Sequence, residues 1–343
     1  MCPMQSELKA LFVDSSQDFT DILGQDDTKQ GLKSALISGR HVIIVGQPGI
    51  GKTTLAKNLA RLLKPIEVVR GCPYHCDPDY PICPQCTSSA PLDRITIPGE
   101  KRFVRIQGSP DLTAEDLLGD IDPLKALEFG PLSPKAFTPG KIFHANRGIL
   151  FFDEVNRCPD KLQNALLQVL EEKIATIGSY DVDFPAEFIF IGTMNPDDTN
   201  TEALSRVFLD RFDLLYMSHP ETLDREIAIV NMKNNLGIAF PDRLLQFTVG
   251  FVRDLRKDKN ISQAPSVRAT IGLYRRACAN ALLEHRAEVG FADIEKAVLS
   301  VLAHRIGLKP SVKYLKTPEG YLAERFERYA QDTEHEPESG EAP

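Results

Sequence analysis

The sequence lacks several features that would place a protein in a membrane or on a nucleic acid. No apolar run approaches the ~18 residues of a membrane-spanning helix, and the first residues, MCPMQSELKA, lack the apolar core of a signal peptide. Positive charge is not in excess either, because the 343 residues carry a formal net charge of −8. Such a charge gives no general affinity for DNA, RNA or anionic lipid, although a local basic patch is compatible with it. We therefore expect a cytoplasmic protein without specific nucleic-acid binding.

The remaining composition is that of an ordinary soluble protein, with 42% apolar and 26% charged residues. The length predicts two or three domains. Short apolar runs alternate with helical patterns up to a break near Pro220, and from residue 223 to about 308 the pattern is helical. The last stretch, from Asp332, is polar and acidic, which predicts a disordered tail.

Residues 41–54, HVIIVGQPGIGKTT, combine a strand, a glycine-rich loop and the start of a helix. The β-branched run 41–45 is typical of a buried strand, and residues 46–53 fit the pattern G-x-x-x-x-G-K-T without a mismatch. The glycines allow a positive φ, so that backbone N–H groups can turn toward one anion at the helix N-terminus. Lys52 would then reach the β and γ phosphates of a nucleotide, and the Thr53 hydroxyl would bind Mg²⁺. The expected nucleotide-binding residues of this segment are Gly46, Gln47, Pro48, Gly49, Ile50, Gly51, Lys52, Thr53 and Thr54.

Two carboxylates end the apolar segment 148–154, GILFFDE, which is typical of a buried strand. Hydrolysis of ATP needs a carboxylate in the Mg²⁺ shell and a group that positions or deprotonates the attacking water. With a P-loop upstream, we predict that Asp153 holds the metal and Glu154 is the base; a pair of helix-capping carboxylates is the alternative. The next apolar run, 188–192, leads to Asn195, which could orient the water or serve only as a turn residue before proline.

Three arginines are candidates for contact with phosphate. The segment 203–212, ALSRVFLDRF, contains Arg206 and Arg211. An arginine there could stabilise the charge of a phosphoryl group bound to a neighbouring subunit, or form a surface salt bridge. Arg268 lies in the first turn of a helix predicted within residues 264–273, where a cation is unfavourable relative to the helix dipole. A nearby phosphate or a carboxylate from elsewhere in the fold would each explain it.

Further segments flank these motifs. Ile22 and Leu23 precede a helical pattern and could sandwich an adenine base, although apolar residues there are equally often part of a core. Residues 71–98 and 111–141 contain many proline and glycine residues and are predicted as insertions, the first outside the sheet and the second a surface hairpin or loop. Residues 174–184 alternate around Gly178-Ser179, as a hairpin would.

Four of the seven cysteines fall within the first insertion, with the spacing C-x₃-C-x₆-C-x₂-C. They are Cys72, Cys76, Cys83 and Cys86. Two close pairs separated by a short loop can supply four thiolates to one tetrahedral Zn²⁺ ion. A redox-active dithiol and simple free thiols are the alternatives in a reducing compartment, where structural disulfides are rare. His75 is a candidate replacement ligand.

The order of these motifs resembles that of the AAA+ ATPases over roughly residues 19–305. GQPGIGKTT resembles Walker A, ILFFDE resembles Walker B and GTMNP resembles the sensor 1 strand. LDRF resembles the arginine-finger segment, which favours Arg211 over Arg206, and PSVRATI resembles sensor 2, with Arg268. The insertion before the Walker B segment and the hairpin before the sensor 1 strand resemble the helix-2-insert clade. TPG and DEVNR are similar to MoxR ATPases, and ANRGIL is similar to the I subunit of magnesium chelatase. The cysteine-rich insertion departs from both.

The resemblance implies an α/β protein: a three-layer α/β/α P-loop domain with a central parallel sheet, followed by a smaller helical lid. The implied divisions are a peripheral segment 1–18, an ATPase core 19–219 with both insertions, a lid 220–310 and a C-terminal extension 311–343 with the acidic tail. It also implies a homo-oligomeric ring, a hexamer, with ATP between neighbouring subunits. The implied partner is a separate protein with a von Willebrand factor A domain.

The expected function is a Mg²⁺-dependent ATPase that uses ATP hydrolysis to remodel a partner protein or complex. One alternative is the motor subunit of a metal chelatase that inserts Mg²⁺ or Co²⁺ into a tetrapyrrole. The other is a nucleotide-gated scaffold with little turnover.

Overall fold

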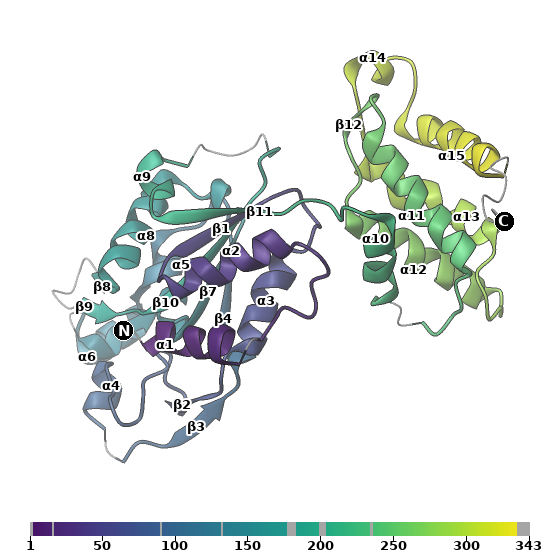
Figure 1. Ribbon diagram of the computed structural model, residues 1–343. Coiled ribbons are helices and arrows are strands. Elements are labelled where there is room, and N and C mark those ends of the chain that lie inside the picture. Colours follow the sequence, from purple (N-terminus) through teal and green to yellow (C-terminus); the bar gives the residue numbers. More distant parts are fainter. Residues whose placement is uncertain are drawn as a thin grey trace. The chain divides into compact units, whose positions relative to one another are not determined.

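Five parallel strands form the central sheet of the computed structural model, which describes residues 3–15, 17–89, 91–131, 133–176, 183–198, 204–233 and 236–334 (Figure 1). The strands are β1 (His41–Val45), β4 (Phe103–Gln107), β7 (Gly148–Asp153), β10 (Phe188–Met194) and β11 (Phe212–Tyr216). Their order is β11-β1-β10-β7-β4. In this register Ile43 lies between Gly192 and Leu214. Because every neighbouring pair is parallel, all five carboxyl ends lie along one edge of the sheet.

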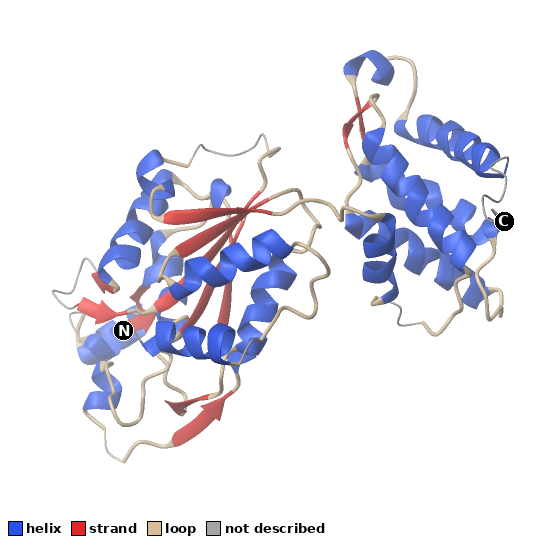
Figure 2. Ribbon diagram, viewed as in Figure 1, coloured by secondary structure: helices blue, strands red, loops and turns tan. Residues whose placement is uncertain are grey.

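Helices cover both faces of this sheet (Figure 2). The described helices of this part of the chain are α1 (Pro3–Lys9), α2 (Asp26–Ile37), α3 (Lys52–Leu62), α4 (Pro84–Thr87), α5 (Ala114–Leu118), α6 (Pro123–Phe129), α7 (Lys141–His144), α8 (Asp160–Glu172) and α9 (Arg206–Leu209). Ile43 and Val45 share a core cluster with Leu166 of α8, and their neighbours Val42 and Ile44 are fully or almost fully buried as well. Successive side chains of a strand point to opposite faces, so both faces of β1 are covered. The predicted α/β/α architecture is confirmed.

Before Met217, the described residues form three antiparallel strand pairs in addition to the central sheet. They join β2 (Ile66–Val69) to β3 (Arg94–Ile97), β5 (Gly119–Ile121) to β6 (Phe137–Pro139), and β8 (Ile174–Thr176) to β9 (Asp183–Pro185). The first pair forms the base of the cysteine-rich insertion. The third pair contains both arms of the hairpin predicted over residues 174–184, whose turn, 177–182, lies outside the described residues.

The structure corrects two sequence-based expectations about peripheral segments. The segment 1–18 packs into the first unit, because Met4, Leu8 and Leu11 recur at helical spacing and are buried. The insertion 111–141 is only partly displayed, since Leu117 and Phe137 belong to the main core. Its helix α5 begins at a capping box of Thr113 and Asp116. Its helix α6 is exposed, and Leu124 and Leu127 face solvent there.

After Met217 the chain passes from one compact unit to another. The second unit contains α10 (Leu223–Asn231), α11 (Asp242–Lys257), α12 (Val267–Leu283), α13 (Phe291–Leu302), α14 (Pro310–Lys313), α15 (Pro318–Glu334) and the strand pair β12 (Ile261–Gln263) and β13 (Gly307–Leu308). The sequence predicts a lid that ends at residue 310. In the structure, Leu322 and Phe326 of α15 join the core around Phe251, because they lie on one face of the helix.

Residues 332–334, which the sequence assigns to the predicted tail, form the end of α15 instead. Residues 335–343 lie outside the described part of the chain. Among the described helices, none combines the length and the apolar character that crossing a bilayer requires.

Candidate active site

The glycine-rich loop connects β1 to α3 at the carboxyl edge of the sheet. Gly49 and Gly51 take φ values of 79° and 109°, which only glycine adopts readily. The Lys52 ammonium folds back over the loop and donates hydrogen bonds to the carbonyl oxygens of Gly46 and of Gln47, the latter at 3.0 Å. Gly51 precedes α3 without a side-chain cap, and the N-terminus of a helix favours an anion. The loop therefore fits the phosphates of a nucleotide.

Asp153 ends β7, between the tips of β10 and β4. Thr193 of β10 donates a hydrogen bond from its hydroxyl to Asp153 Oδ1 at 2.6 Å. Arg105 of β4 donates to the other oxygen, Oδ2, at 2.5 Å. Two neighbouring strands thus hold this carboxylate in place, at the edge where the P-loop begins.

Glu154 follows in the left-handed region, with a φ of 56°. Its N–H donates to the same Thr193 hydroxyl at 2.9 Å. Its carboxylate accepts a hydrogen bond on Oε2 from Gln107 Nε2 at 2.8 Å, and the same oxygen forms an ion pair with Arg157 Nη1 at 2.9 Å. Arg157 also pairs with Asp198 at 2.7 Å, and the hydrogen bond to Asp198 raises the pKa of Arg157 above its ordinary value. Glu154 is therefore oriented by side chains from two different segments.

Asn195 lies just beyond the end of β10, next to this group. Its side-chain oxygen accepts a hydrogen bond from the Asp197 N–H at 3.3 Å. This interaction is typical of a turn residue, the alternative to a role in orienting water. Its carbonyl oxygen accepts a hydrogen bond from the Asn156 side chain at 3.4 Å. A role in orienting water stays a prediction.

Ile22 lies beside the last glycine of the loop, where a Cβ on Gly51 would come within 3.6 Å of Ile22 Cδ1. The side chain of Ile22 is buried, whereas Leu23 is half-buried. The position next to the P-loop agrees with a role at the base of a nucleotide, but burial also agrees with a core role. Adenine contact by this pair stays a prediction.

The two arginines after β10 differ in their surroundings. Arg206 begins α9 and is exposed. Arg211 forms an ion pair with Glu171 of α8 and donates a hydrogen bond to the Val207 carbonyl oxygen at 2.6 Å. Within a single chain Arg211 is thus already occupied, and a role in a neighbouring subunit would require that it leave Glu171.

The remaining candidate arginine belongs to the second unit. Arg268 is the second residue of the 17-residue helix α12 and is exposed. Its contact with a nucleotide stays a prediction.

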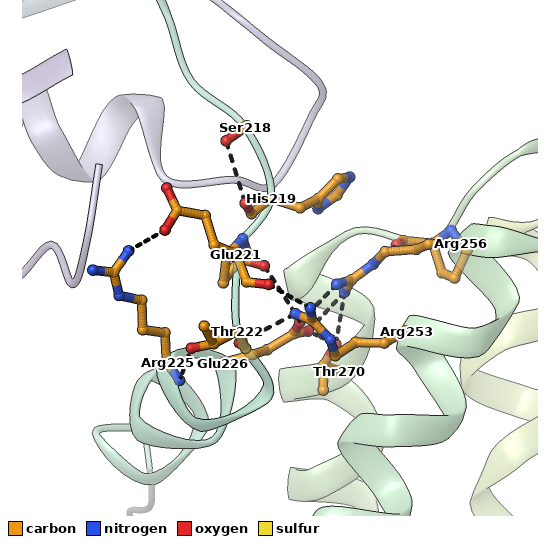
Figure 3. A network of polar contacts seen from close by, with 11 residues as sticks. Ser218, His219, Glu221, Thr222, Arg225, Glu226, Arg253, Arg256 and Thr270 are labelled. Carbon is orange, nitrogen blue, oxygen red and sulfur yellow. Dashed lines mark hydrogen bonds and ion pairs between the residues drawn. The ribbon is translucent and has the colours of Figure 1, made fainter. Parts of the chain in front are cut away.

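A buried ion cluster lies in the second unit, close to Arg268 in sequence (Figure 3). Glu226 of α10 is fully buried and accepts hydrogen bonds from Arg256 at 2.6 and 2.7 Å, from Arg253 at 3.2 Å and from Thr270 at 2.7 Å. Arg253 also donates to the carbonyl oxygens of residues 220, 221 and 222. The cluster therefore ties the start of the unit to α11 and to the first turns of α12.

The four cysteines of the insertion meet at one point. All four are buried, and their sulfur atoms lie within 4.8 Å of one another. The Sγ atoms of Cys72 and Cys83 are 3.8 Å apart, which is far too long for a disulfide. Backbone N–H groups donate to sulfur at 3.4 Å, from Ile82 and Cys83 to Cys76 and from Cys86 to Cys83. Burial, together with the neighbouring thiols, raises the pKa of Cys86 above its ordinary value.

His75 does not join this group among the described residues. Its Nδ1 atom instead lies 3.4 Å from the carbonyl oxygen of Asn146. Burial lowers the pKa of His75, so the ring is more readily neutral than an exposed histidine. His75, the candidate to replace one of the cysteine ligands, therefore contacts Asn146 instead of the cysteine cluster.

The sequence analysis missed Arg105, Gln107, Arg157 and Thr193, all of which contact the two carboxylates. A signal was present for Gln107 and Thr193, because each is a polar residue at or near the carboxyl end of an apolar strand. Only the strand order shows that both of these strand ends lie beside the carboxyl end of β7.

The parallel sheet, the P-loop and the carboxylates at the adjacent strand tip define a P-loop ATPase of the AAA+ class. Residues 92–214 match the family described as "ATPase family associated with various cellular activities (AAA)", and residues 254–319 match the AAA lid domain. Residues 18–70 match "Magnesium chelatase, subunit ChlI". The chain belongs to the family of the magnesium-chelatase subunit ChlI.

Two relatives support this assignment. The chain is 30% identical over 330 residues to the magnesium-chelatase subunit ChlI homolog of Methanocaldococcus jannaschii, covering 85% of this chain and 86% of that protein. It is 32% identical over 244 residues to the magnesium-chelatase 38 kDa subunit of Acidiphilium rubrum, covering 69% and 67%. The chain is accordingly a ChlI-like AAA+ ATPase, an enzyme that uses ATP and Mg²⁺.

A solved structure has the same fold. It is a chain in the complex between subunits BchI and BchD of magnesium chelatase, determined from a cryo-EM reconstruction. The TM-score is 0.51 with 24% sequence identity, and the match covers 89% of this chain and 98% of that chain.

Proposed function

We propose that the chain uses the energy of ATP hydrolysis to remodel a partner protein or protein complex. The observation that carries this proposal is the pair Asp153 and Glu154, held at the sheet edge beside the P-loop by contacts from β4 and β10. Carboxylates that only capped a helix would not need this support from two neighbouring strands. A scaffold with little turnover is disfavoured for the same reason.

Each residue of the site then has one role. Lys52 and the N–H groups at the start of α3 bind the phosphates. Glu154 accepts the proton of the attacking water. An arginine beside a carboxylate makes it a weaker base, so Arg157 has to release Glu154 during turnover. Arg157 would keep its ion pair with Asp198 at 2.7 Å when it releases Glu154, so its charge would not be left without a partner.

The donor set fits Mg²⁺. Asp153 offers a carboxylate and Thr53 a hydroxyl, and oxygen atoms are the ligands that Mg²⁺ prefers in proteins. When bound with ATP, the ion neutralises charge on the β and γ phosphates. Thr193 and Arg105 keep the Asp153 carboxylate in one orientation before the nucleotide arrives.

The assembly that we propose is a homo-oligomeric ring, a hexamer, in which Arg211 acts on ATP bound to the neighbouring subunit. Arginine suits the charge that spreads over a transferring phosphoryl group. Glu171 holds Arg211 until the neighbour is in place. The proposed partner is a separate protein with a von Willebrand factor A domain, and the cytoplasmic location stays a prediction.

A second candidate function is the motor subunit of a metal chelatase, which drives Mg²⁺ or Co²⁺ into a tetrapyrrole. The relatives named above favour it, because both are named for magnesium chelatase. In that case the remodelled partner would be the subunit that carries the tetrapyrrole.

The test uses Glu154→Gln, which keeps the shape of the side chain but removes the base. We expect ATP binding to survive while turnover falls roughly 10²- to 10⁴-fold. In the presence of ATP this variant should retain its partner, which is then identified by mass spectrometry. Glu172→Gln, on the exposed end of α8, is the control with wild-type turnover.

Turnover of Glu154→Gln at the wild-type rate would show that the base is another residue. Metal insertion into a porphyrin by the chain and its captured partner would decide for the chelatase motor. Release of the partner with no effect on a porphyrin would decide for protein remodelling.

We further propose a structural Zn²⁺ ion at the cysteine cluster. Four sulfur atoms around zinc at about 2.3 Å form a tetrahedron with edges of about 3.8 Å. The distance of 3.8 Å between the sulfur atoms of Cys72 and Cys83 fits such an edge. The three N–H donors to sulfur would stabilise thiolates, and the separation favours metal binding over a disulfide.

A further inference from the structure

The turn before β7 is stabilised by the cysteine-rich insertion. Asn146 is buried and its side chain donates a hydrogen bond to the carbonyl oxygen of Tyr74 at 2.7 Å. Arg147 has a positive φ of 60° and donates to the carbonyl oxygen of His75 at 3.3 Å. It also forms an ion pair with Asp77 at 3.3 Å. Three contacts thus connect the insertion to the two residues that directly precede β7.

The residues that make these contacts lie next to the cysteines. Tyr74 and His75 are between Cys72 and Cys76, and Asp77 follows Cys76 directly. A metal bound to both cysteines would close a short loop and fix the carbonyl groups that Asn146 and Arg147 contact. The Tyr74 ring also packs on Phe143 at 5.2 Å between ring centroids, just before the turn.

The insertion has little regular structure to hold it without a metal. Between β2 and β3 the described residues contain only the four-residue helix α4. Ordering such a segment costs conformational entropy, and the few apolar side chains that it buries offset only part of that cost. A metal that binds the folded form supplies the remaining stabilisation.

A second support of the turn does not involve the cysteines. Arg102 is buried and donates to the carbonyl oxygen of Arg147 at 2.8 Å, and it pairs with Glu7 of α1 at the same distance. It also donates to the carbonyl oxygen of Lys64, after α3, at 2.8 Å. Loss of the metal should therefore loosen the turn without unfolding the sheet.

We infer that the tetrathiolate cluster, with zinc bound, positions the Walker B strand β7 by fixing the turn at residues 145–148. Glu154 and Asp153 stand at the other end of that strand, which has six residues. The metal would thus act on hydrolysis through the strand, while the P-loop keeps its own geometry. The inference rests on the proposed zinc ion, and its catalytic consequence rests on the proposed ATPase site.

The experiment measures amide hydrogen exchange in the full-length protein, before and after a chelator removes the metal. Elemental analysis of the starting protein should find about one zinc per chain. In the metal-free protein, the amides of residues 145–148 should exchange roughly tenfold faster. The reason is that the side chains of Asn146 and Arg147 donate hydrogen bonds to carbonyl groups of the insertion that are then no longer fixed, so the turn opens more often. Exchange in β1 should not change, and added Zn²⁺ should restore the protection of the turn.

Two arginine-to-lysine variants separate the turn contact from the metal itself. Arg147→Lys removes the guanidinium group that donates a hydrogen bond to the His75 carbonyl oxygen, but it keeps all four cysteine thiols. It should retain zinc and still show faster exchange at residues 145–148. The matched control is Arg94→Lys, because Arg94 also contacts the insertion, at Asp79, but is half exposed and does not touch the turn. That variant should retain both zinc and the protection of the turn.

Activity provides the second readout. Metal-free protein should bind ATP with unchanged Kd but hydrolyse it roughly tenfold to a hundredfold more slowly, because a shift of the strand misplaces Glu154. Cys83→Ser combined with Cys86→Ser should reproduce this loss and contain no zinc. If that variant does not fold, the chelated wild-type protein and Arg147→Lys still decide the question.

Unchanged exchange at residues 145–148 after complete loss of zinc would overturn the inference, and so would purified protein without zinc that has four freely titrating thiols. Neither result would affect the proposed ATPase function. Absence of ATP hydrolysis in zinc-loaded wild-type protein would refute that function and leave the exchange result standing.

Discussion

Glu226→Ala tests how far the second unit depends on its buried ion cluster (Figure 3). The Glu226 side chain is fully buried, and Arg256, which bonds both of its oxygens, has only 9% of its side chain exposed. Alanine would leave the guanidinium groups of Arg253 and Arg256 without their carboxylate. Thr270, which donates its hydroxyl proton to Glu226, would lose its acceptor as well.

The expected loss is large because a charge would remain buried without its partner. Breaking a buried ion pair by removing one side costs about 3–5 kcal/mol. For a unit of this size, each kcal/mol shifts the Tm by about 3–5 °C, so the transition of the second unit should fall by roughly 10–20 °C. Glu226→Gln keeps the shape and several hydrogen bonds and should lower the Tm by less.

The assay is differential scanning calorimetry of the full-length chain, which can resolve the thermal transitions of the two units. The matched control is Glu221→Ala, whose side chain is 72% exposed and pairs with Arg225 one helical turn away. An exposed pair of this kind contributes less than about 1 kcal/mol, so the control should shift the Tm by only a few degrees. A shift for Glu226→Ala as small as that of the control would refute the reasoning.

The same residue predicts how stability depends on pH. Burial alone would raise the pKa of Glu226, but hydrogen bonds and charge from Arg256, with Thr270 and Arg253, hold it below its ordinary value of 4.5. The carboxylate therefore loses its proton more readily in the folded state. The stabilisation that the ionised Glu226 gives to the folded state is fully present above pH 4.5. It is lost as the pH falls through the lower pKa that Glu226 has in the folded state. The Tm difference between wild type and Glu226→Ala should shrink over that acidic range.

Three further predictions concern the active site. Lys52→Ala should weaken binding of a fluorescent ATP analogue roughly tenfold to a hundredfold, because a charged donor to phosphate is lost; an unchanged Kd would contradict the P-loop assignment. Thr193→Val, which removes the hydroxyl shared by Asp153 and Glu154, should lower kcat roughly tenfold or more without changing the Tm greatly; wild-type kcat would show that this support is unimportant. Mixing inactive Arg211→Ala with inactive Glu154→Gln subunits should restore part of the ATPase activity, since some sites would combine two intact halves; no recovery in demonstrably mixed rings would count against action across subunits.

The local parts of the site could be predicted from the sequence because they consist of contiguous residues. The run 41–54 specifies a strand, a loop with glycines at positive φ and a helix start, and the structure places them in that order. The strand that ends at Asp153 was predicted in the same way. Short segments of this kind depend mainly on backbone preferences and apolar patterning, which neighbouring residues determine.

The partners of those residues were decided by the tertiary structure. Glu154 contacts Thr193 and Gln107, which lie 39 and 47 positions away, and Arg102 contacts Glu7, which lies 95 positions away. The spacing of the four cysteines left zinc, a redox dithiol and free thiols as alternatives, and it did not predict that their loop would contact the turn before β7. Such contacts arise because strand order and packing bring distant segments together, and a single sequence does not state which polar side chains will then meet. The sequence by itself therefore determined the class of chemistry, and the fold decided which side chains hold its carboxylates in place.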